Sequence, residues 1–425
     1  MTRAALRSAA RSILRAGLDA VEPGRLVRAH LSFEGGTIRA GDTIVRDPRR
    51  VFLVSVGKAA VPMARAAHRL LGRRINAAVV IAPARAPRLP RTTAFAAGHP
   101  IPNREGLRAA RHVIRLLESA SKGDLVLLLL SGGASALMPA PVKGVTLADK
   151  RRITRLLLMR GANIDELNAV RKRLSLLKGG GFARLASPAT VATLAISDVP
   201  GDDVGTIGSG PTVRDRNAAT TARRVVARFL GDVALPTGVR RALSAREIHR
   251  SRSTHARIKV IGSGRQFAEA AAHRARALGF RSVVREGALH GEARNCGPRL
   301  VRVFEEQRKR NPLCLIATGE TVVRVLGNGR GGRNQEVALS AIGALSRRPI
   351  PTVLATLATD GRDGPTPYCG GLVDDLSSRR ARKRGIDWEA FLENNDSSRA
   401  LRSLNALLKA KNNRTNVADV TVLLG

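Results

Sequence analysis

A short segment after a strongly apolar run contains residue types that bind anions. Six apolar residues, Leu125 to Leu130, predict a buried strand, and the chain continues as Ser131-Gly132-Gly133-Ala134-Ser135. Successive backbone N–H groups in such a turn can form a concave nest for an anion. The Ser135 hydroxyl lies in the first turn of the next helix and can add a hydrogen bond. This pattern predicts a phosphate or substrate site.

Two lysines lie beside glycines in expected turns. Lys58 follows the strand Val51–Val56 and Gly57 and precedes a helix, whose N-terminus attracts anions. The Walker A spacing is absent. The alternative is a surface lysine at a helix start, which the helix dipole disfavours. Lys178 precedes a glycine triplet and is a second candidate for binding phosphate or substrate.

Aspartates follow a second apolar strand. Val191 to Ile196 predicts this strand, which ends in Ser197-Asp198, with Asp202 and Asp203 close behind. In open α/β sheets, ligands bind at the carboxyl ends of the strands. Carboxylates in that position suit Mg²⁺, which also bridges phosphates. A turn built by Asp and Gly explains the pattern equally well.

The last third of the sequence contains a second group of candidates. A predicted strand from Leu313 to Ala317 is followed by Glu320, and a glycine-rich loop then ends at Arg333-Asn334, where a helix begins. Arginine binds phosphate or carboxylate with two parallel hydrogen bonds. The loop therefore predicts an anion site that includes Arg333, with Glu320 and Asn334 as further candidates for binding substrate or phosphate.

Another strand, Thr352 to Leu357, leads to Asp360-Gly361-Arg362-Asp363-Gly364. Two aspartates among glycines after a strand predict a metal or general-base site. Asp360 is the better candidate because it lies nearer the strand end. With Asp198, it completes the predicted metal ligands.

Positioning these groups requires alternating strands and helices. Amphipathic helices are predicted at Leu147–Arg160 and Ile164–Leu177, and a basic first helix at Met1–Ala20, which we interpret as structural rather than as a transit peptide. A break at Pro236-Thr237-Gly238 suggests a domain boundary. We predict an α/β protein with a Rossmann-like parallel sheet in residues 1–237 and a smaller α/β domain in residues 238–425.

Composition narrows the choice of function. The 425 residues carry a formal net charge of +40, but only 3% are aromatic. A basic surface attracts anions and binds nucleic acid non-specifically, whereas sequence-tolerant single-strand binding uses aromatic stacking. We therefore expect solvated basic faces and no specific nucleic-acid partner. Three scattered cysteines show no metal or disulfide spacing, and no apolar run spans a bilayer. These features favour a cytoplasmic protein without membrane contact.

Seven motifs in the same order resemble the type-2 glycerate kinases, the TtuD/MOFRL family, which also has the older label of hydroxypyruvate reductases. The likeness covers nearly the whole chain, and its motifs are Ser55–Ala59, Gly98-His99-Pro100, Ser131–Ser135, Ser197–Asp203, Ser209–Thr212, Gly332–Glu336 and Thr359–Gly361. Seven ordered motifs are far more specific than any one of them.

The resemblance implies two α/β domains with the active site in the cleft between them. It implies transfer of the ATP γ-phosphate to the 2-hydroxyl of D-glycerate, with Mg²⁺, by a monomer or homodimer. In this family, the lysine and arginine matching Lys58 and Arg333 are taken as important for catalysis. The sequence departs from the family pattern at Pro367–Gly371, at Asn412–Arg414 and in the missing aromatics after Asn395-Asp396-Ser397. These changes concern the rim of the C-terminal domain and leave the central lysine, arginine and aspartates in place.

Two other functions remain open at this point. The first is an NAD(P)H-dependent hydroxypyruvate reductase, which would need a dinucleotide fingerprint. Gly262-Ser263-Gly264 begins a degenerate match, with Phe267 at the third glycine position, and is read as an ordinary strand-to-helix turn. The second is a basic nucleic-acid-binding protein, suggested by the charge of +40.

Overall fold

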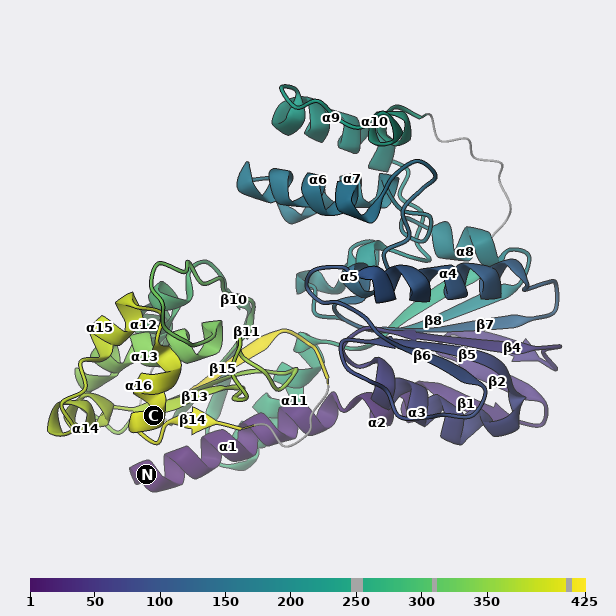
Figure 1. The fold of residues 1–425 in the computed structure, drawn as a ribbon. Helices are drawn as coiled ribbons and strands as arrows, with labels where there is room; N and C mark the ends of the chain where they lie inside the picture. The colour runs from purple at the N-terminus through teal and green to yellow at the C-terminus, as the bar shows by residue number, and fades with distance from the viewer. Residues whose placement is uncertain (246–254, 308–311, 410–414) are drawn as a thin grey trace. The chain divides into compact units, whose positions relative to one another are not determined.

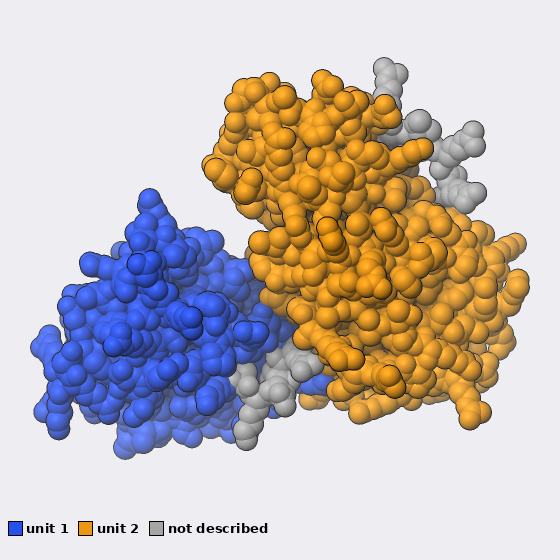
Figure 2. Space-filling model, in the orientation of Figure 1, with its two compact units in different colours: residues 1–22, 262–425 blue, residues 23–261 orange. Residues whose placement is uncertain are grey.

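The computed structural model describes residues 1–245, 255–307, 312–409 and 415–425 (Figure 1). The departure from the family pattern at Asn412–Arg414 lies among the residues that are not described, 410–414. The chain forms two compact units, coloured separately in Figure 2. Unit 1 comprises Met1–Glu22 and Gly262–Gly425, and unit 2 comprises Pro23–Ile261.

Unit 2 is built on a six-stranded sheet with the order β6-β5-β4-β7-β8-β9. Strands β4 to β8 pair in parallel, as the Rossmann-like prediction required. The strands are β4 (Val51–Val56), β5 (Ile75–Ala82), β6 (Thr92–Ala96), β7 (Leu125–Leu130), β8 (Thr190–Ile196) and β9 (Ala256–Gly262). Every residue of β4 and β7 is buried, which explains their unbroken apolar sequences.

Helices cover both faces of this sheet (Figure 1). One face packs against α4 (Arg104–Glu118) and α8 (Gly181–Ala186), which share a hydrophobic core with β4, β7 and β8. The other packs against α3 (Ala60–Leu71). The helix α2 (Pro23–His30) and a small antiparallel sheet lie beside α3; its strands are β1 (Leu31–Glu34), β2 (Thr37–Ala40) and β3 (Thr43–Arg46).

A group of helices in unit 2 has a core of its own. The connecting segments contain the short helices α5 (Ala134–Leu137), η1 (Gly72–Arg74), η2 (Pro200–Asp202) and η3 (Ile207–Ser209). The helices of the group are α6 (Leu147–Met159), α7 (Ile164–Arg173), α9 (Ala218–Leu230) and α10 (Thr237–Ser244). Capping boxes begin α6 and α7. The helix predicted to reach Leu177 ends at Arg173, because Gly179 and Gly180 both have positive φ angles further on.

Unit 1 contains a mixed six-stranded sheet with the order β10-β11-β15-β12-β13-β14. Strand β15 runs antiparallel between β11 and β12. The strands are β10 (Arg281–Leu289), β11 (Leu313–Gly319), β12 (Val353–Ala358), β13 (Gly370–Asp374), β14 (Leu407–Leu408) and β15 (Asp419–Leu424). The helices are α11 (Gly264–Ala277), α12 (Ala293–Gln307), α13 (Arg333–Ser346), α14 (Ser377–Lys383), α15 (Trp388–Glu393) and α16 (Ser397–Ser403).

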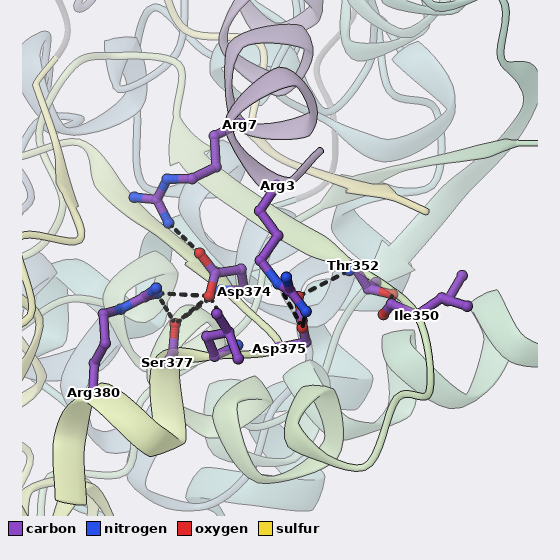
Figure 3. A network of polar contacts seen from close by, with 9 residues as sticks. Arg3, Arg7, Ile350, Thr352, Asp374, Asp375, Ser377 and Arg380 are labelled. Carbon is purple, nitrogen blue, oxygen red and sulfur yellow. Dashed lines mark hydrogen bonds and ion pairs between the residues drawn. The ribbon is translucent and has the colours of Figure 1, made fainter. Parts of the chain in front are cut away.

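The first helix, α1 (Arg3–Ala20), belongs to unit 1 although it precedes unit 2 in the sequence. It packs on α11 so closely that a Cβ atom on Gly17 would lie 2.5 Å from the Phe267 ring. Arg3 and Arg7 reach carboxylates at the end of β13 (Figure 3): Arg7 Nη1 lies 2.6 Å from Asp374 Oδ2. The predicted segments 1–237 and 238–425 differ from the two units by α1, by α10 and by β9, which extends the sheet of unit 2.

Candidate functional site

The parallel sheet of unit 2 brings two predicted turns together. Strands β4 and β7 are neighbours, with Val56 opposite Leu130, so Lys58 and Ser131 leave the sheet at the same edge. The backbone N–H of Lys58 donates to the Gly132 carbonyl at 2.9 Å, and that of Ala59 donates to Ser131 Oγ at 3.1 Å. These hydrogen bonds fix the turn that presents Lys58 against the Ser131 turn.

Gly133 lies between the Lys58 and His99 side chains. Its φ angle is 85°, and a Cβ atom there would lie 2.9 Å from His99 Cδ2 and 3.6 Å from Lys58 Cγ. Within the described chain, the N–H groups of Gly132 and Gly133 have no hydrogen-bond partner. Two available amides beside a lysine ammonium suit an oxyanion such as phosphate. The predicted cradle at Ser131–Gly133 therefore has a geometry that fits its expected ligand.

Ser135 and Lys178 meet next to this cradle. The Lys178 ammonium donates to the Ser135 carbonyl at 2.8 Å, and the Ser135 and Ser209 hydroxyls are 3.0 Å apart. Ser209 in turn donates to Asn168 Oδ1 at 3.2 Å. Burial, and then repulsion from Lys150 and other nearby cations, lowers the pKa of Lys178 well below its ordinary value. Two separate motifs of the sequence thus form one polar cluster.

The aspartates after β8 have different surroundings. Strand β8 is the neighbour of β7, so Asp198 lies at the same edge of the sheet as Lys58 and Ser131. Asp203 accepts hydrogen bonds from the Thr206 hydroxyl at 2.6 Å and the Gly205 amide at 3.1 Å. The Thr206 bond is the largest influence that lowers the pKa of Asp203. Asp203 builds a turn, whereas Asp198 follows the end of β8 by two residues.

In unit 1, a carboxylate that the sequence did not single out holds Arg333. Asp419 begins β15 and pairs in register with Gly319 of β11 and Ala358 of β12. Both Nε and Nη2 of Arg333 donate to Asp419, the latter at 3.1 Å, and Nη1 donates to Glu320. Asp419 is 2% exposed. A bidentate carboxylate of this kind fixes the plane of the guanidinium.

Burial and charge oppose each other in this ion pair. Burial alone would lower the pKa of Arg333, but Asp419 and Glu320 outweigh it and raise that pKa. Burial raises the pKa of Asp419, and the Arg333 guanidinium counteracts this shift. Arg333 therefore stays charged and is oriented by a buried partner, as a residue that meets an anion would need to be.

The first amides of the glycine-rich loop before Arg333 are bonded within the chain and are not offered to a ligand. The N–H groups of Leu326 and Gly327 donate to Asn395 Oδ1 at 2.7 and 3.0 Å. Those of Asn328 and Arg330 donate to the side chains that flank Asn395 in the sequence. The Asn394-Asn395-Asp396 segment thus binds the loop internally, and its function is to hold the start of α13.

A protein carboxylate also occupies the N-terminus of α13. Asp363 accepts from the N–H of Asn334 at 3.1 Å and from that of Gln335 at 2.7 Å. Asn334 is 1% exposed, and its side-chain oxygen accepts from the Thr356 hydroxyl at 2.7 Å. The predicted anion site at this helix start is therefore filled by Asp363. Of the candidates on α13, Arg333 is the residue whose charge is placed to meet a ligand.

Asp360 is the predicted metal ligand of unit 1. Asp360 lies just beyond β12 and accepts a hydrogen bond from the Arg362 amide at 3.1 Å. Among the residues that the structure describes, no three His, Cys, Asp or Glu side chains form a metal-binding group. Mg²⁺ commonly uses one or two carboxylates with the phosphates of a nucleotide. Asp198 of unit 2 and Asp360 of unit 1 each stay a predicted metal ligand.

The sequence analysis missed Asp419 and Asp363 as functional supports. Asp419 begins the last strand and is not among the predicted candidates, and Asp363 comes second to Asp360 because it lies farther from the strand end. In both cases, the sequence signal that could have found the residue is an aspartate next to a strand end or a glycine turn. His99, which belongs to a recognised motif, borders Gly133 although it was not among the predicted site residues.

Comparison with known proteins covers both units. Residues 9–244 match a family described as a domain of unknown function, DUF4147, and residues 313–419 match the MOFRL family. The chain is 36% identical to D-glycerate 2-kinase of Thermotoga maritima over 98% of each chain. It is 34% identical to glycerate kinase of Homo sapiens, covering 99% of this chain and 93% of the human protein.

Solved structures show the same relationship. The crystal structure of glycerate kinase from Thermotoga maritima superimposes with a TM-score of 0.86 at 35% identity, covering 99% of both chains. A Pyrococcus horikoshii structure gives a TM-score of 0.81 at 32% identity. The fold thus places the chain in a class of two-unit α/β proteins with a C-terminal MOFRL region. Within that class, the chain belongs to the glycerate kinase family, as its motifs predicted.

No helix in the described part of the chain has the length and apolar character needed to cross a bilayer. The three cysteines, Cys296, Cys314 and Cys369, are buried and form no disulfide.

Proposed function

We propose that this protein is an ATP-dependent glycerate 2-kinase that converts D-glycerate to 2-phosphoglycerate. The main support is the match over 98% of its length to a relative named D-glycerate 2-kinase. The oxyanion cradle beside Lys58 and the oriented guanidinium of Arg333 agree with this chemistry. The names of the relatives favour phosphoryl transfer over the reductase alternative.

In the proposed reaction, the 2-hydroxyl oxygen of glycerate forms a bond to the γ-phosphorus as the bond to the β-phosphate oxygen breaks, releasing ADP. Phosphoryl transfer needs mainly positioning and neutralisation of charge. Lys58 and the Gly132 and Gly133 amides would bind phosphate oxygens, and Arg333 would bind the transferring phosphoryl group or the glycerate carboxylate. Asp198 or Asp360 would hold Mg²⁺, which neutralises phosphate charge when bound. The other aspartate would accept the hydroxyl proton.

The remaining site residues have supporting parts in this proposal. Ser131 fixes the Lys58 turn through its hydroxyl, and Ser135 and Lys178 extend the polar cluster beside the cradle. Glu320 shares Arg333 with Asp419 and is half exposed, so a substrate can displace it. Asn334, which is buried, would act by holding the first turn of α13.

The test compares Lys58→Ala and Arg333→Ala with matched controls in a coupled assay for ADP release. Removing one charged contact to the transition state costs on the order of 10²–10³ in turnover. Lys122→Ala, an exposed lysine of unit 2, and Arg347→Ala, an exposed arginine that follows the same helix as Arg333, should retain normal turnover. Near-normal turnover in both active-site variants, with intact folding, would reject these assignments.

A further inference from the structure

Three basic side chains of unit 2 lie in a buried region, and none of the ion pairs recorded among the described residues joins them to a carboxylate. Lys150 comes from α6, Arg171 from α7, and Lys178 from the turn before α8. Lys150 and Lys178 are 8% and 6% exposed. The pKa values of both lysines are lowered first by burial, and then by repulsion from cations of this same group. The Lys150 ammonium reaches the carbonyl of Leu174, which lies between Arg171 and Lys178 in the sequence, so the three residues belong to one region of unit 2.

The chain supplies these groups with neutral oxygen atoms only. The Lys150 ammonium donates to the Leu174 carbonyl at 3.0 Å, and the Lys178 ammonium donates to the Ser135 carbonyl at 2.8 Å. An ammonium has three donors, so each lysine retains donors beyond these bonds. Among the described residues, Arg171 has no hydrogen bond or ion pair, although burial lowers its pKa.

Nearby acids have other partners. Lys172, the next residue after Arg171, forms an ion pair with Asp215 at 2.7 Å. Asp149 and Glu166, at the starts of α6 and α7, close capping boxes. A charge buried without a partner costs stability, and natural chains seldom keep three of them together. Perturbed groups of this kind concentrate at functional sites.

The cluster is connected to the candidate phosphate cradle. Ser135, whose carbonyl binds Lys178, follows Gly133 by two residues and lies in the first turn of α5. Its hydroxyl meets Ser209, which is bonded to Asn168 of α7, one turn before Arg171. Among the described residues, Lys178 is bonded to the Ser135 carbonyl. A ligand in the cradle would therefore bind two residues away from the group that holds Lys178.

We propose that Lys150, Arg171 and Lys178 form an anion subsite that binds the oxygens of a phosphate or carboxylate group of the substrates. This proposal deepens the proposed kinase function and rests on it for the identity of the anion. The two sources are the nucleotide phosphates and the glycerate carboxylate. An anion supplies the missing counter-charge, and it restores the protonated form of both lysines.

Binding should therefore take up protons. Burial, with Arg171 adding repulsion, lowers the pKa of Lys150 to about 7, and Lys178 is shifted in the same direction. At pH 8 the ligand-free Lys150 is therefore largely neutral, so an anion that restores its charge draws protons from the buffer. Affinity should rise as the pH falls from about 9 to about 7, because protonation then costs less.

The experiment is isothermal titration calorimetry on the full chain at pH 8, in two buffers of different ionisation enthalpy. Separate titrations use inorganic phosphate, a non-hydrolysable ATP analogue and D-glycerate. Lys178→Met and Arg171→Gln are compared with Arg155→Gln, an exposed arginine of α6. We expect proton uptake in the unmodified protein, and about 10- to 100-fold weaker binding of one anion class in the two cluster variants. The control should bind normally.

Stability separates this role from a structural one. Because methionine removes a buried, repelled amine, Lys178→Met should leave the melting temperature of the ligand-free protein unchanged or higher. Lys150→Met provides a second such variant. Unchanged affinity for all three anions, absence of binding to the unmodified protein, or weaker binding accompanied by a lower melting temperature would each overturn the proposal. Because no turnover is measured, weakened anion binding would support the subsite even if glycerate proved not to be phosphorylated.

Discussion

The ion pair between Arg333 and Asp419 gives the sharpest single perturbation. Asp419→Asn keeps the side-chain shape but replaces a carboxylate by an amide whose nitrogen would face the guanidinium. Removing one partner of a fully buried pair costs about 3–5 kcal/mol. Here the Arg333 side chain is 29% exposed and keeps Glu320 as a partner, so we expect a loss of about 1–3 kcal/mol.

The effect on activity follows from orientation. Asp419 would act as a positioning residue, since it fixes the plane of Arg333 without touching substrate. Losing such an outer partner typically costs about 10- to 100-fold, and we expect the loss in kcat, with a smaller change in KM. Unfolding in urea and steady-state kinetics measure the two effects on the same preparation.

Glu320→Gln is the matched control for this pair. Glu320 contacts the same guanidinium but is 49% exposed, so its removal should cost well under 1 kcal/mol because solvent screens the pair. If Asp419→Asn lowered stability yet left kcat within about twofold, Asp419 would be structural only. If it changed neither quantity, the arrangement of Arg333 described here would be incorrect.

Three further predictions concern the two units separately. Burial raises the pKa of Asp124, but Arg50 and Ser121 lower it by more, so the net shift is downward. The stability that this carboxylate adds above its unfolded pKa should therefore be lost on acidification. In Asp124→Asn, the free energy of unfolding should depend less on pH between about 5 and 2. Gly133→Ala should weaken nucleotide binding at least tenfold in a fluorescence titration, because the new methyl group would press on the His99 ring at a φ of 85°; unchanged affinity would contradict the cradle. Arg7→Ala should lower the melting temperature by a few degrees through loss of the Asp374 pair; an unchanged melting temperature would show that this pair does not hold α1.

The sequence was sufficient for the strands and the local turns of the fold. Strands β4 and β7 were predicted with their observed bounds, because every residue in them is apolar or small and buried. The turns that follow them place Lys58 and Ser131 at one edge of the sheet, as the rule for parallel strands requires. The family could be identified because its motifs are short contiguous segments, and this sequence contains them in the same order.

The missing information concerned contacts between residues distant in the sequence. Asp419 lies 86 residues from Arg333, and only the antiparallel insertion of β15 between β11 and β12 brings them together. The glycine-rich loop was interpreted as an anion cradle because the asparagines that bind its amides come from a helix end much later in the chain. The position of α1 on unit 1 was likewise invisible, since the residues it packs against follow unit 2.

The most direct measurement is product formation by the purified protein with ATP, Mg²⁺ and D-glycerate. Product is detected through enolase, which accepts 2-phosphoglycerate, and the Thermotoga maritima relative serves as the positive control. We predict stoichiometric formation of ADP and 2-phosphoglycerate, and its loss on replacement of Lys58. Formation of 3-phosphoglycerate, or no phosphorylated product under conditions where the relative is active, would contradict the proposed function.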